Sequence, residues 1–313
     1  MEQLGKGSKM SRLLAPIVLF VYNRLDHTVQ TIKALQKNKL ADESDLFIYS
    51  DAAKSEVDIE KVDEVRKFIN SIAGFKNISI IERDENFGLA NSIIDGVTNI
   101  VNKYGKIIVL EDDIITSPLF LEYINNVLDV YENEDDVSSV SGYMFPIEFP
   151  QNEFYFLPMI SSWGWGTWKK SWDIFEPNGQ KLLKIIQDRG EKKAFNLDNT
   201  YPYLKMLKNQ IKGKNNSWAI RWNASLFVSK KLSVWPSKSL VDNIGFDGSG
   251  THCNIDYYSK NNIFSNKQTT IFNNQVSISE QPYNLIKKYL IEAGLSQLSI
   301  RKVMLKLISL CRK

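Results

Sequence analysis

Three carboxylates stand side by side near the middle of the chain, at Glu111, Asp112 and Asp113. They follow the apolar run 107–110, which is typical of a strand buried on both faces of a parallel sheet. Grouped carboxylates repel one another and raise each other's pKa unless a cation lies between them. Hard oxygen ligands suit Mg²⁺ and Mn²⁺, so this stretch predicts a divalent-metal site.

The position of these acids favours a ligand site over a merely solvated cluster. Open α/β sheets bind their ligands outside the carboxyl ends of central strands. The alternative is that one carboxylate caps the next helix while the others face water. It is less favoured because Thr116 and Ser117, just before Pro118, already suit a helix cap.

Length and composition set broad limits. The chain has 313 residues, 43% hydrophobic and 24% charged, which is ordinary for a globular protein with a real core. A net charge of +3 does not argue for binding nucleic acid. Only Cys253 and Cys311 are present, so neither a disulfide framework nor a thiolate zinc site is expected.

Strand and helix patterns alternate along the first half. Period-3.6 apolar patterns lie between short β-rich runs, which predicts a mostly parallel, Rossmann-like sheet with helices on both faces. The expected strands are 17–22, 46–50, 78–81, 107–110 and 137–140, with a proline-ended edge strand at 232–236. No Gly-x-Gly-x-x-Gly or Gly-Lys-Ser/Thr loop follows the first strand, which speaks against dinucleotide and P-loop sites.

The second half is rich in tryptophan. Trp163 and Trp165 alternate with glycines, so their rings suit stacking on a sugar or base, although a core under a long loop is an equal alternative. Trp168 and Trp172, four residues apart, are expected to be helical core residues. Arg221, between two further tryptophans, is positioned to hold a phosphate or to pack on a ring.

A glycine-rich loop follows, running from Asp242 to His252. Such loops are natural lids over a phosphate or a metal. His252 at its end is a candidate metal ligand, with a solvated histidine as the alternative. His27, the other histidine, is expected on the surface at a helix start.

The two ends of the chain differ in character. Lys6, Lys9 and Arg12 before the apolar run 13–22 imitate a signal peptide, but no cleavage pattern follows, so residues 1–14 are interpreted as a flexible leader. Residues 285–313 carry a net charge of +6 in a basic amphipathic pattern. This C-terminal tail, 276–313, predicts contact with an anionic membrane surface, and an ordinary helix docked on the domain is the alternative.

Several motifs in fixed order resemble those of GT-A glycosyltransferases of the family 2 type, as found in bacterial surface-polysaccharide synthesis. The resemblance covers about residues 15–255 and rests on the segments Pro16–Arg24, Ser50-Asp51, Asn86–Leu89, Leu110–Asp113 and Trp163–Trp168. It implies a nucleotide-sugar-binding half over residues 15–145 and an acceptor-binding half over residues 146–275.

The resemblance also assigns roles. Asp113 would bind Mn²⁺ or Mg²⁺ directly, with His252 completing the metal shell. Glu111 stands where the family's Asp-x-Asp motif has its first Asp, and its own role stays open. The remaining donor-binding residues that the resemblance or the tryptophan pattern implies are Tyr22, Asn23, Arg24, Asp51, Asn86, Gly88, Asp112, Trp163, Trp165 and Arg221.

The implied activity is a metal-dependent transfer of a hexosyl or N-acetylhexosaminyl group. The sugar would pass, with inversion, from a nucleotide diphosphate-sugar to a hydroxyl of a glycan or lipid-linked acceptor. A carboxylate would act as general base, with Asp242 and Asp247 as candidates and Asp173 and Glu176 behind them. The expected location is cytoplasmic or peripheral on the inner face of the plasma membrane.

Other functions fit less well. A sugar-nucleotide nucleotidyltransferase would need a glycine-rich loop after the first strand, where Tyr22-Asn23-Arg24 holds no glycine. A haloacid-type phosphatase would place its aspartates after the first strand, not the fourth. A non-catalytic carbohydrate-binding module would explain the tryptophans but not the three carboxylates.

Overall fold

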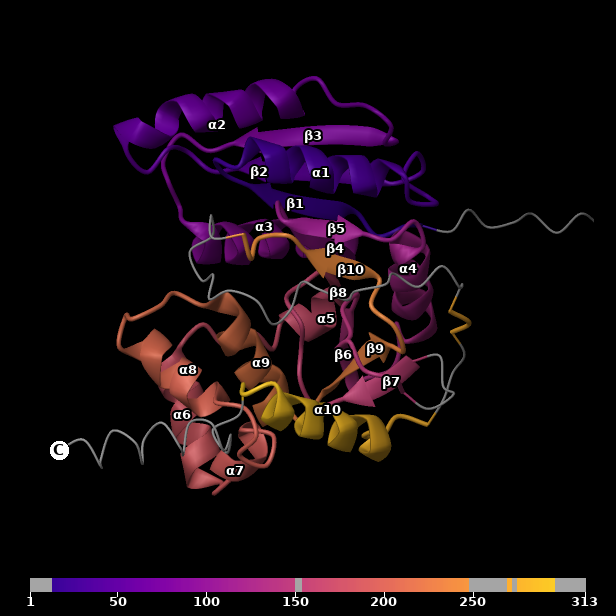
Figure 1. The fold of residues 1–313 in the computed structure, drawn as a ribbon, viewed down its shortest axis with the longest axis vertical. Coiled ribbons are helices and arrows are strands. Elements are labelled where there is room, and N and C mark those ends of the chain that lie inside the picture. Colours follow the sequence, from indigo (N-terminus) through magenta and orange to yellow (C-terminus); the bar gives the residue numbers. More distant parts are fainter. Residues whose placement is uncertain (1–12, 150–153, 248–268, 272–274, 296–313) are drawn as a thin grey trace, which may run out of the picture.

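The computed structural model describes residues 13–149, 154–247, 269–271 and 275–295 (Figure 1). The strands are β1 (Ile17–Val21), β2 (Asp45–Ser50), β3 (Asn77–Glu82), β4 (Lys106–Glu111), β5 (Ile114–Thr116), β6 (Val137–Ser141), β7 (Phe154–Leu157), β8 (Trp165–Trp168), β9 (Leu232–Pro236) and β10 (Val241–Asn243). The helices are α1 (Leu25–Gln36), α2 (Glu56–Ile69), α3 (Leu89–Tyr104), α4 (Phe120–Val130), α5 (Lys169–Trp172), α6 (Gly179–Asp188), α7 (Lys192–Phe195), α8 (Tyr203–Ile211), α9 (Trp218–Val228) and α10 (Glu280–Glu292).

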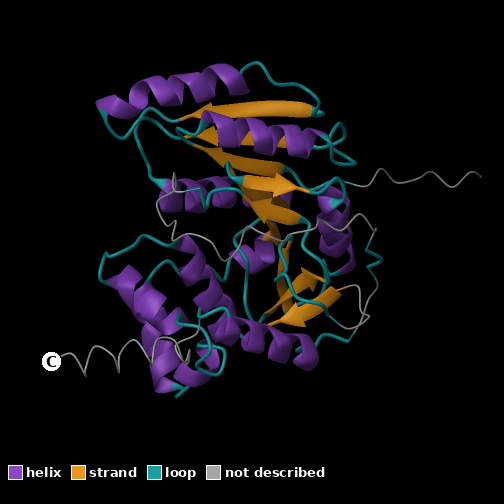
Figure 2. Ribbon diagram, viewed as in Figure 1, coloured by secondary structure: helices purple, strands orange, loops and turns teal. Residues whose placement is uncertain are grey.

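One eight-stranded sheet runs through both halves of the chain, in the order β3-β2-β1-β4-β8-β6-β9-β7 (Figure 2). Strands β3, β2, β1 and β4 are parallel, as the alternating pattern predicts. The residues 107–110 of β4 are fully buried, because helices cover both faces of the sheet. Helices α1, α2 and α4 contribute to the core on one face, and α3 and α9 to the core on the other. The predicted fold class is confirmed.

The tryptophan-rich segment continues the sheet. β8 pairs antiparallel with β4, which brings residues 165–168 directly beside the acidic strand. Trp168 and Trp172 are core residues as expected, but Trp168 ends a strand and does not belong to a helix. The prediction that 232–236 is an edge strand is wrong, because β9 lies between β6 and β7. Pro236 is accommodated there because it is the last residue of the strand.

Helix α10 packs on the second half of the molecule, in the lower part of Figure 1. Ile286 and Leu290 are buried, and Ser279 exchanges hydrogen bonds with Phe156 of β7. The start of the tail, residues 280–292, is therefore a helix docked on the domain, which is the alternative to membrane contact. The rest of the expected membrane-contacting tail, 296–313, lies outside the described residues. Within the described part of the chain, no helix is both long and apolar enough to span a bilayer.

Candidate active site

The strand order defines a switch point between β1 and β4. From β1 the chain moves outward to β2 and β3, and it then returns to place β4 on the other side of β1. Ligands of open α/β sheets bind in the crevice at such a point, beyond the carboxyl ends of the strands. Arg24 follows β1, and Glu111 is the last residue of β4. Arg24 and the three carboxylates therefore come together at this switch point.

The guanidinium of Arg24 bridges two carboxylates. Its Nη2 donates to Oδ2 of Asp113 at 2.8 Å and to Oδ1 of Asp112, and its Nε donates to Oδ2 of Asp112 at 3.3 Å. Burial by itself lowers the pKa of Arg24, but Asp112 and then Asp113 outweigh burial and raise that pKa. The guanidinium therefore stays charged between the two acids.

The charges at this site do not balance, because three adjacent carboxylates are grouped with one arginine, which contacts two of them. Burial, then the charges of Asp113 and Asp112, raise the pKa of Glu111 to about 8, while Arg24 opposes the rise. Burial also raises the pKa of Asp112, again against Arg24. Glu111 continues the side of β4 that faces α3 and α9, because side chains alternate along a strand. A further cation would offset the excess negative charge.

The carboxylate oxygens of this site suit Mg²⁺ or Mn²⁺ bound together with a phosphate ligand. Carboxylate oxygens of Asp112 and Asp113 converge on one nitrogen of Arg24, and a metal ion held by both carboxylates would take the place of that nitrogen. Among the described residues, no group of three or more His, Cys, Asp or Glu side chains forms a ready metal site. Mg²⁺ commonly takes one or two protein carboxylates and completes its shell with substrate phosphates and water. His252, the other predicted ligand, lies outside the described residues.

The segment 241–245, which includes β10, packs against Asp113. β10 pairs antiparallel with β5, and the amide of Ile244 donates to the backbone oxygen of Asp113 at 2.9 Å. Gly245 then passes so near the carboxylate that a Cβ there would overlap Oδ2 and lie 3.0 Å from Cγ. Glycine at this position lets the backbone approach the Asp113 side chain.

His27 is a site residue that the sequence interpretation missed. Its Nε2 lies 3.1 Å from Oδ2 of Asp247, and only 12% of its side chain is exposed. His27 also lies near enough to Asp112 to act on that carboxylate electrostatically. The available signal was helical spacing, because Arg24 and His27 stand three residues apart where α1 begins. Its burial depends on the distant segment around Asp247, which one local pattern does not reveal.

Asp51 organises the turn after β3 and the start of α3. Its Oδ1 accepts from the amides of Ala52 and Phe87 at 3.0 and 2.8 Å, and its Oδ2 accepts from the amide of Gly88 at 2.8 Å and from Nδ2 of Asn86 at 3.2 Å. Asp51, Asn86 and Gly88 are thus brought together, while their implied contacts with the donor stay predictions. The hydrogen bonds of the carboxylate go to the protein itself, which makes Asp51 a positioning residue.

Tyr22 and Asn23 shape the neighbouring loop. The Tyr22 hydroxyl accepts from the amide of Lys54 at 3.0 Å, and Nδ2 of Asn23 donates to Asp58 at 2.9 Å. Both residues follow β1 and lie at the same edge of the sheet as Arg24. They fix the segment that joins β2 to α2.

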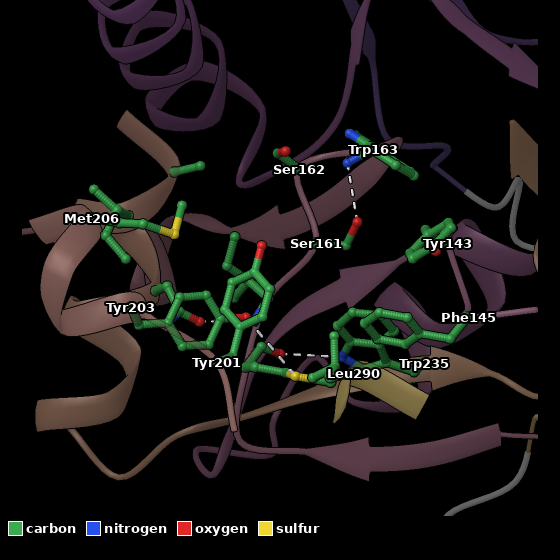
Figure 3. Close-up of a pocket in the computed structure, with 15 residues that line it drawn as sticks. Tyr143, Phe145, Ser161, Ser162, Trp163, Tyr201, Tyr203, Met206, Trp235 and Leu290 are labelled. Atoms are coloured by element: carbon green, nitrogen blue, oxygen red, sulfur yellow. Dashed lines mark hydrogen bonds between the residues drawn. The ribbon is translucent and has the colours of Figure 1, made fainter. Parts of the chain in front are cut away.

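The two alternating tryptophans have different surroundings. Trp165 is 1% exposed and stacks on Trp218 at 5.2 Å in the core, so the expectation that it faces a donor is wrong. It lies in β8, on the face of the sheet covered by α3 and α9. Trp163 is partly buried and lines a cavity of about 180 Å³ (Figure 3). Its ring also meets Phe246 at 5.5 Å, so Trp163 lies between the cavity and the segment that closes on Asp113.

Arg221 is a buried structural residue. It is 7% exposed, and its guanidinium donates to the backbone oxygens of Ser217 and Pro177 and to Oδ1 of Asn216, at 3.2–3.4 Å. Burial lowers its pKa. These contacts hold the start of α9 against the loop before α6. The expected contact with a donor phosphate is therefore not supported, because neutral oxygens of the protein occupy the guanidinium.

The two candidate bases differ in their surroundings. Asp242 is half-buried in β10, opposite Ile115, and it acts electrostatically on the buried hydroxyl of Tyr143 at the cavity. Asp247 has 49% of its side chain exposed and pairs with His27. Asp173, considered behind them, pairs with Lys169, and Glu176 pairs with Lys181.

Comparisons with protein-family models and with curated proteins gave no match. Among solved structures, the chain resembles the mannosyltransferase PcManGT from Pyrobaculum calidifontis in complex with GDP-Man and Mn²⁺, at 11% identity and a TM-score of 0.36, over 50% of this chain and 46% of that one. It resembles residues 1–349 of TarS from S. aureus at 10% identity and 0.39, over 72% and 59%. A UDP-glucose pyrophosphorylase complexed with UDP-glucose aligns at 12% and 0.36, over 71% and 90%.

The chain thus spans only about half the length of the first two of these structures. Likeness at this level concerns the course of the chain and does not define an activity. The molecule's own geometry is more specific. A parallel half with its switch point at β1 and β4, an acidic end on β4 and an antiparallel continuation through β8 form a GT-A-like fold, as the sequence resemblance predicts.

Proposed function

We propose that this chain is a metal-dependent glycosyltransferase that uses a nucleotide diphosphate-sugar donor. The observation that carries the proposal is the pair Asp112 and Asp113 converging on Arg24 at the switch point of the sheet. A diphosphate requires positive charge, and this place offers an arginine together with carboxylates suited to a divalent cation. A bound Mn²⁺ or Mg²⁺ held by Asp113, with Asp112 beside it, would neutralise charge on the diphosphate leaving group.

The residues around this pair have complementary tasks in the proposal. Arg24 binds the diphosphate, while Tyr22 and Asn23 fix the neighbouring loop. Asp51 holds the turn at Asn86 to Gly88, which borders the donor site. His252 would complete the metal shell.

The proposed reaction is a single displacement with inversion. A bond forms between the acceptor oxygen and the anomeric carbon, and the bond from that carbon to the phosphate oxygen breaks. The nucleoside diphosphate departs, and the proton of the acceptor hydroxyl passes to Asp242. Asp242 is preferred over Asp247 because its charge acts on Tyr143, which lines the cavity, whereas Asp247 pairs with His27. The acceptor is a glycan or lipid-linked glycan of surface-polysaccharide synthesis.

Calorimetry with UDP and GDP tests the proposal. We expect one of them to bind in the presence of Mn²⁺, and we expect this binding to disappear with EDTA and in Asp113→Ala. Asp135→Ala is the matched control, because that exposed carboxylate lies outside the site and pairs with Lys170. Nucleotide binding that survives both EDTA and Asp113→Ala would overturn the metal site. A folded protein that binds neither nucleotide but binds sugars would be a carbohydrate-binding module instead.

A further inference from the structure

The cavity beside the candidate active site has an uncharged lining. It is formed by residues of β9, α8, α9, α10 and the segments on either side of β7 (Figure 3). Among the described residues that line it, none is Asp, Glu, Lys, Arg or His. A phosphate or carboxylate entering this space would lose its water without meeting a counter-charge, which is unfavourable.

Aromatic rings form a firm wall on one side. Tyr143 meets Trp163 edge to face at 4.6 Å, and Trp235 stacks on Phe145 at 6.0 Å with an interplanar angle of 8°. The indole Nε1 of Trp235 donates to the backbone oxygen of Met159 at 3.1 Å, which fixes its ring. The cavity of about 180 Å³ is smaller than the roughly 300–1,000 Å³ of sites that enclose a whole ligand. It therefore suits a single ring.

Asn223 supplies a polar group to the lining. It is 4% exposed, and its Oδ1 accepts from the amide of Ile160 at 3.0 Å. That bond orients the amide, and its Nδ2 has no hydrogen-bond partner among the described residues. Asn223 lines the cavity, so the oxygen of a ligand that enters it is a suitable acceptor for this donor.

The cavity is linked to the acidic cluster by a chain of contacts and by an electrostatic interaction. Trp163 lines the cavity and touches Phe246, whose neighbour Gly245 packs on the carboxylate of Asp113. Asp242 acts electrostatically on Tyr143, another lining residue. A ring in the cavity would thus be linked through Trp163 and Phe246 to the segment that packs on Asp113.

We infer that this cavity binds the uncharged pyranose ring of the acceptor, and that Asn223 donates to a ring or hydroxyl oxygen to select it. A pyranose offers an apolar C–H face for the aromatic wall and oxygens at its edge for the amide. The inference rests on the proposed function, since it names the class of acceptor for the same site. Charged sugars, such as uronates, are excluded by the neutral lining and by the nearby carboxylate of Asp242.

Ligand binding without donor or metal tests this directly. The probes are the methyl glycosides of glucose, galactose, mannose and N-acetylglucosamine. Each is titrated into the protein, and its binding is followed by tryptophan fluorescence and by saturation-transfer NMR. We expect at least one to bind saturably, and its uronate counterpart to bind about tenfold more weakly or worse. Equal binding of the uronate would overturn the charge selection.

Variants locate the site and identify the donor group. Asn223→Ala should weaken the pyranoside about tenfold, whereas Asn125→Ala, which removes another buried amide in α4, should leave the affinity unchanged. Asn223→Asp keeps an acceptor for the Ile160 amide and introduces a charge. It should gain affinity for protonated methyl glucosaminide while losing affinity for the neutral sugar, which a purely structural role of Asn223 would not produce.

The outcomes separate this inference from the proposed function. If UDP or GDP binds with Mn²⁺ but no pyranoside binds, the cavity inference fails and the transferase proposal stands. If pyranosides bind and Asn223→Asp shows no change in charge preference, the assignment of Asn223 fails. If pyranosides bind as expected but no nucleotide does, the proposed function fails, and with it the identification of the ring as an acceptor.

Discussion

Nη2 of Arg24 lies 2.8 Å from Oδ2 of Asp113, at the point where Asp112 also directs its carboxylate. The arginine therefore supplies the positive charge between these acids in the protein without ligands. Replacing it leaves two largely buried carboxylates close together, and either protonation of one of them or a cation of another kind would relieve their repulsion.

We predict that Arg24→Gln lowers the free energy of unfolding by about 2 kcal/mol without metal, since the loss of one partner leaves buried charges unpaired. Saturating Mn²⁺ should restore most of this stability and should stabilise the variant more than the wild type. Urea unfolding with and without Mn²⁺ measures both effects. An identical deficit in both conditions would show that the cation does not bind between these carboxylates.

Gly245→Ala tests the approach of β10 to the acidic cluster. The added Cβ would overlap the carboxylate of Asp113 and shift it, so the Mn²⁺-dependent affinity for a nucleoside diphosphate should fall about tenfold. The melting temperature should change little, because the displaced group is a side-chain end. Gly96→Ala is the contrasting control, with a Cβ placed 2.7 Å from Cζ of Phe20 in the core. That variant should lose about 1–3 kcal/mol of stability and keep its affinity once folded.

Asp51→Ala should destabilise the fold by about 3 kcal/mol. The carboxylate accepts from three backbone amides and the side chain of Asn86, and its removal leaves those donors without a partner. Asn86→Ala, which removes one of these donors, should cost about 1 kcal/mol. Urea unfolding gives both values. A stable Asp51→Ala protein that no longer distinguishes UDP from GDP would instead assign Asp51 to the nucleotide base.

The parallel half of the sheet and its acidic end were predictable from local pattern. Strands such as β4 are short apolar runs, and the helices between them show their apolar faces at helical spacing. Glu111, Asp112 and Asp113 were found because three adjacent carboxylates after such a run are physically unfavourable without a cation. These features depend on neighbouring residues alone.

The second half was harder because its signals are not local. All four residues of β8 are buried, so Trp165–Trp168 shows no alternation that would reveal a strand. From the sequence, Trp165 and Arg221 were candidate donor-binding residues. Both are buried in the fold because of the way α9 packs. His27 belongs to the site only because Asp247, 220 residues later, lies against it. Contacts between distant segments set these outcomes.

Asp242→Asn should lower kcat for sugar transfer by about 100-fold or more and leave nucleotide binding intact, because general-base assistance acts on the acceptor proton. The charge of Asp242 acts on Tyr143, which lines the cavity, whereas Asp247 pairs with His27. Asp247→Asn is therefore the matched control, and its kcat should fall far less. Steady-state transfer rates and calorimetry separate catalysis from donor binding. If Asp247→Asn loses more activity than Asp242→Asn, with both proteins folded and binding donor equally, the base must be reassigned to the carboxylate paired with His27.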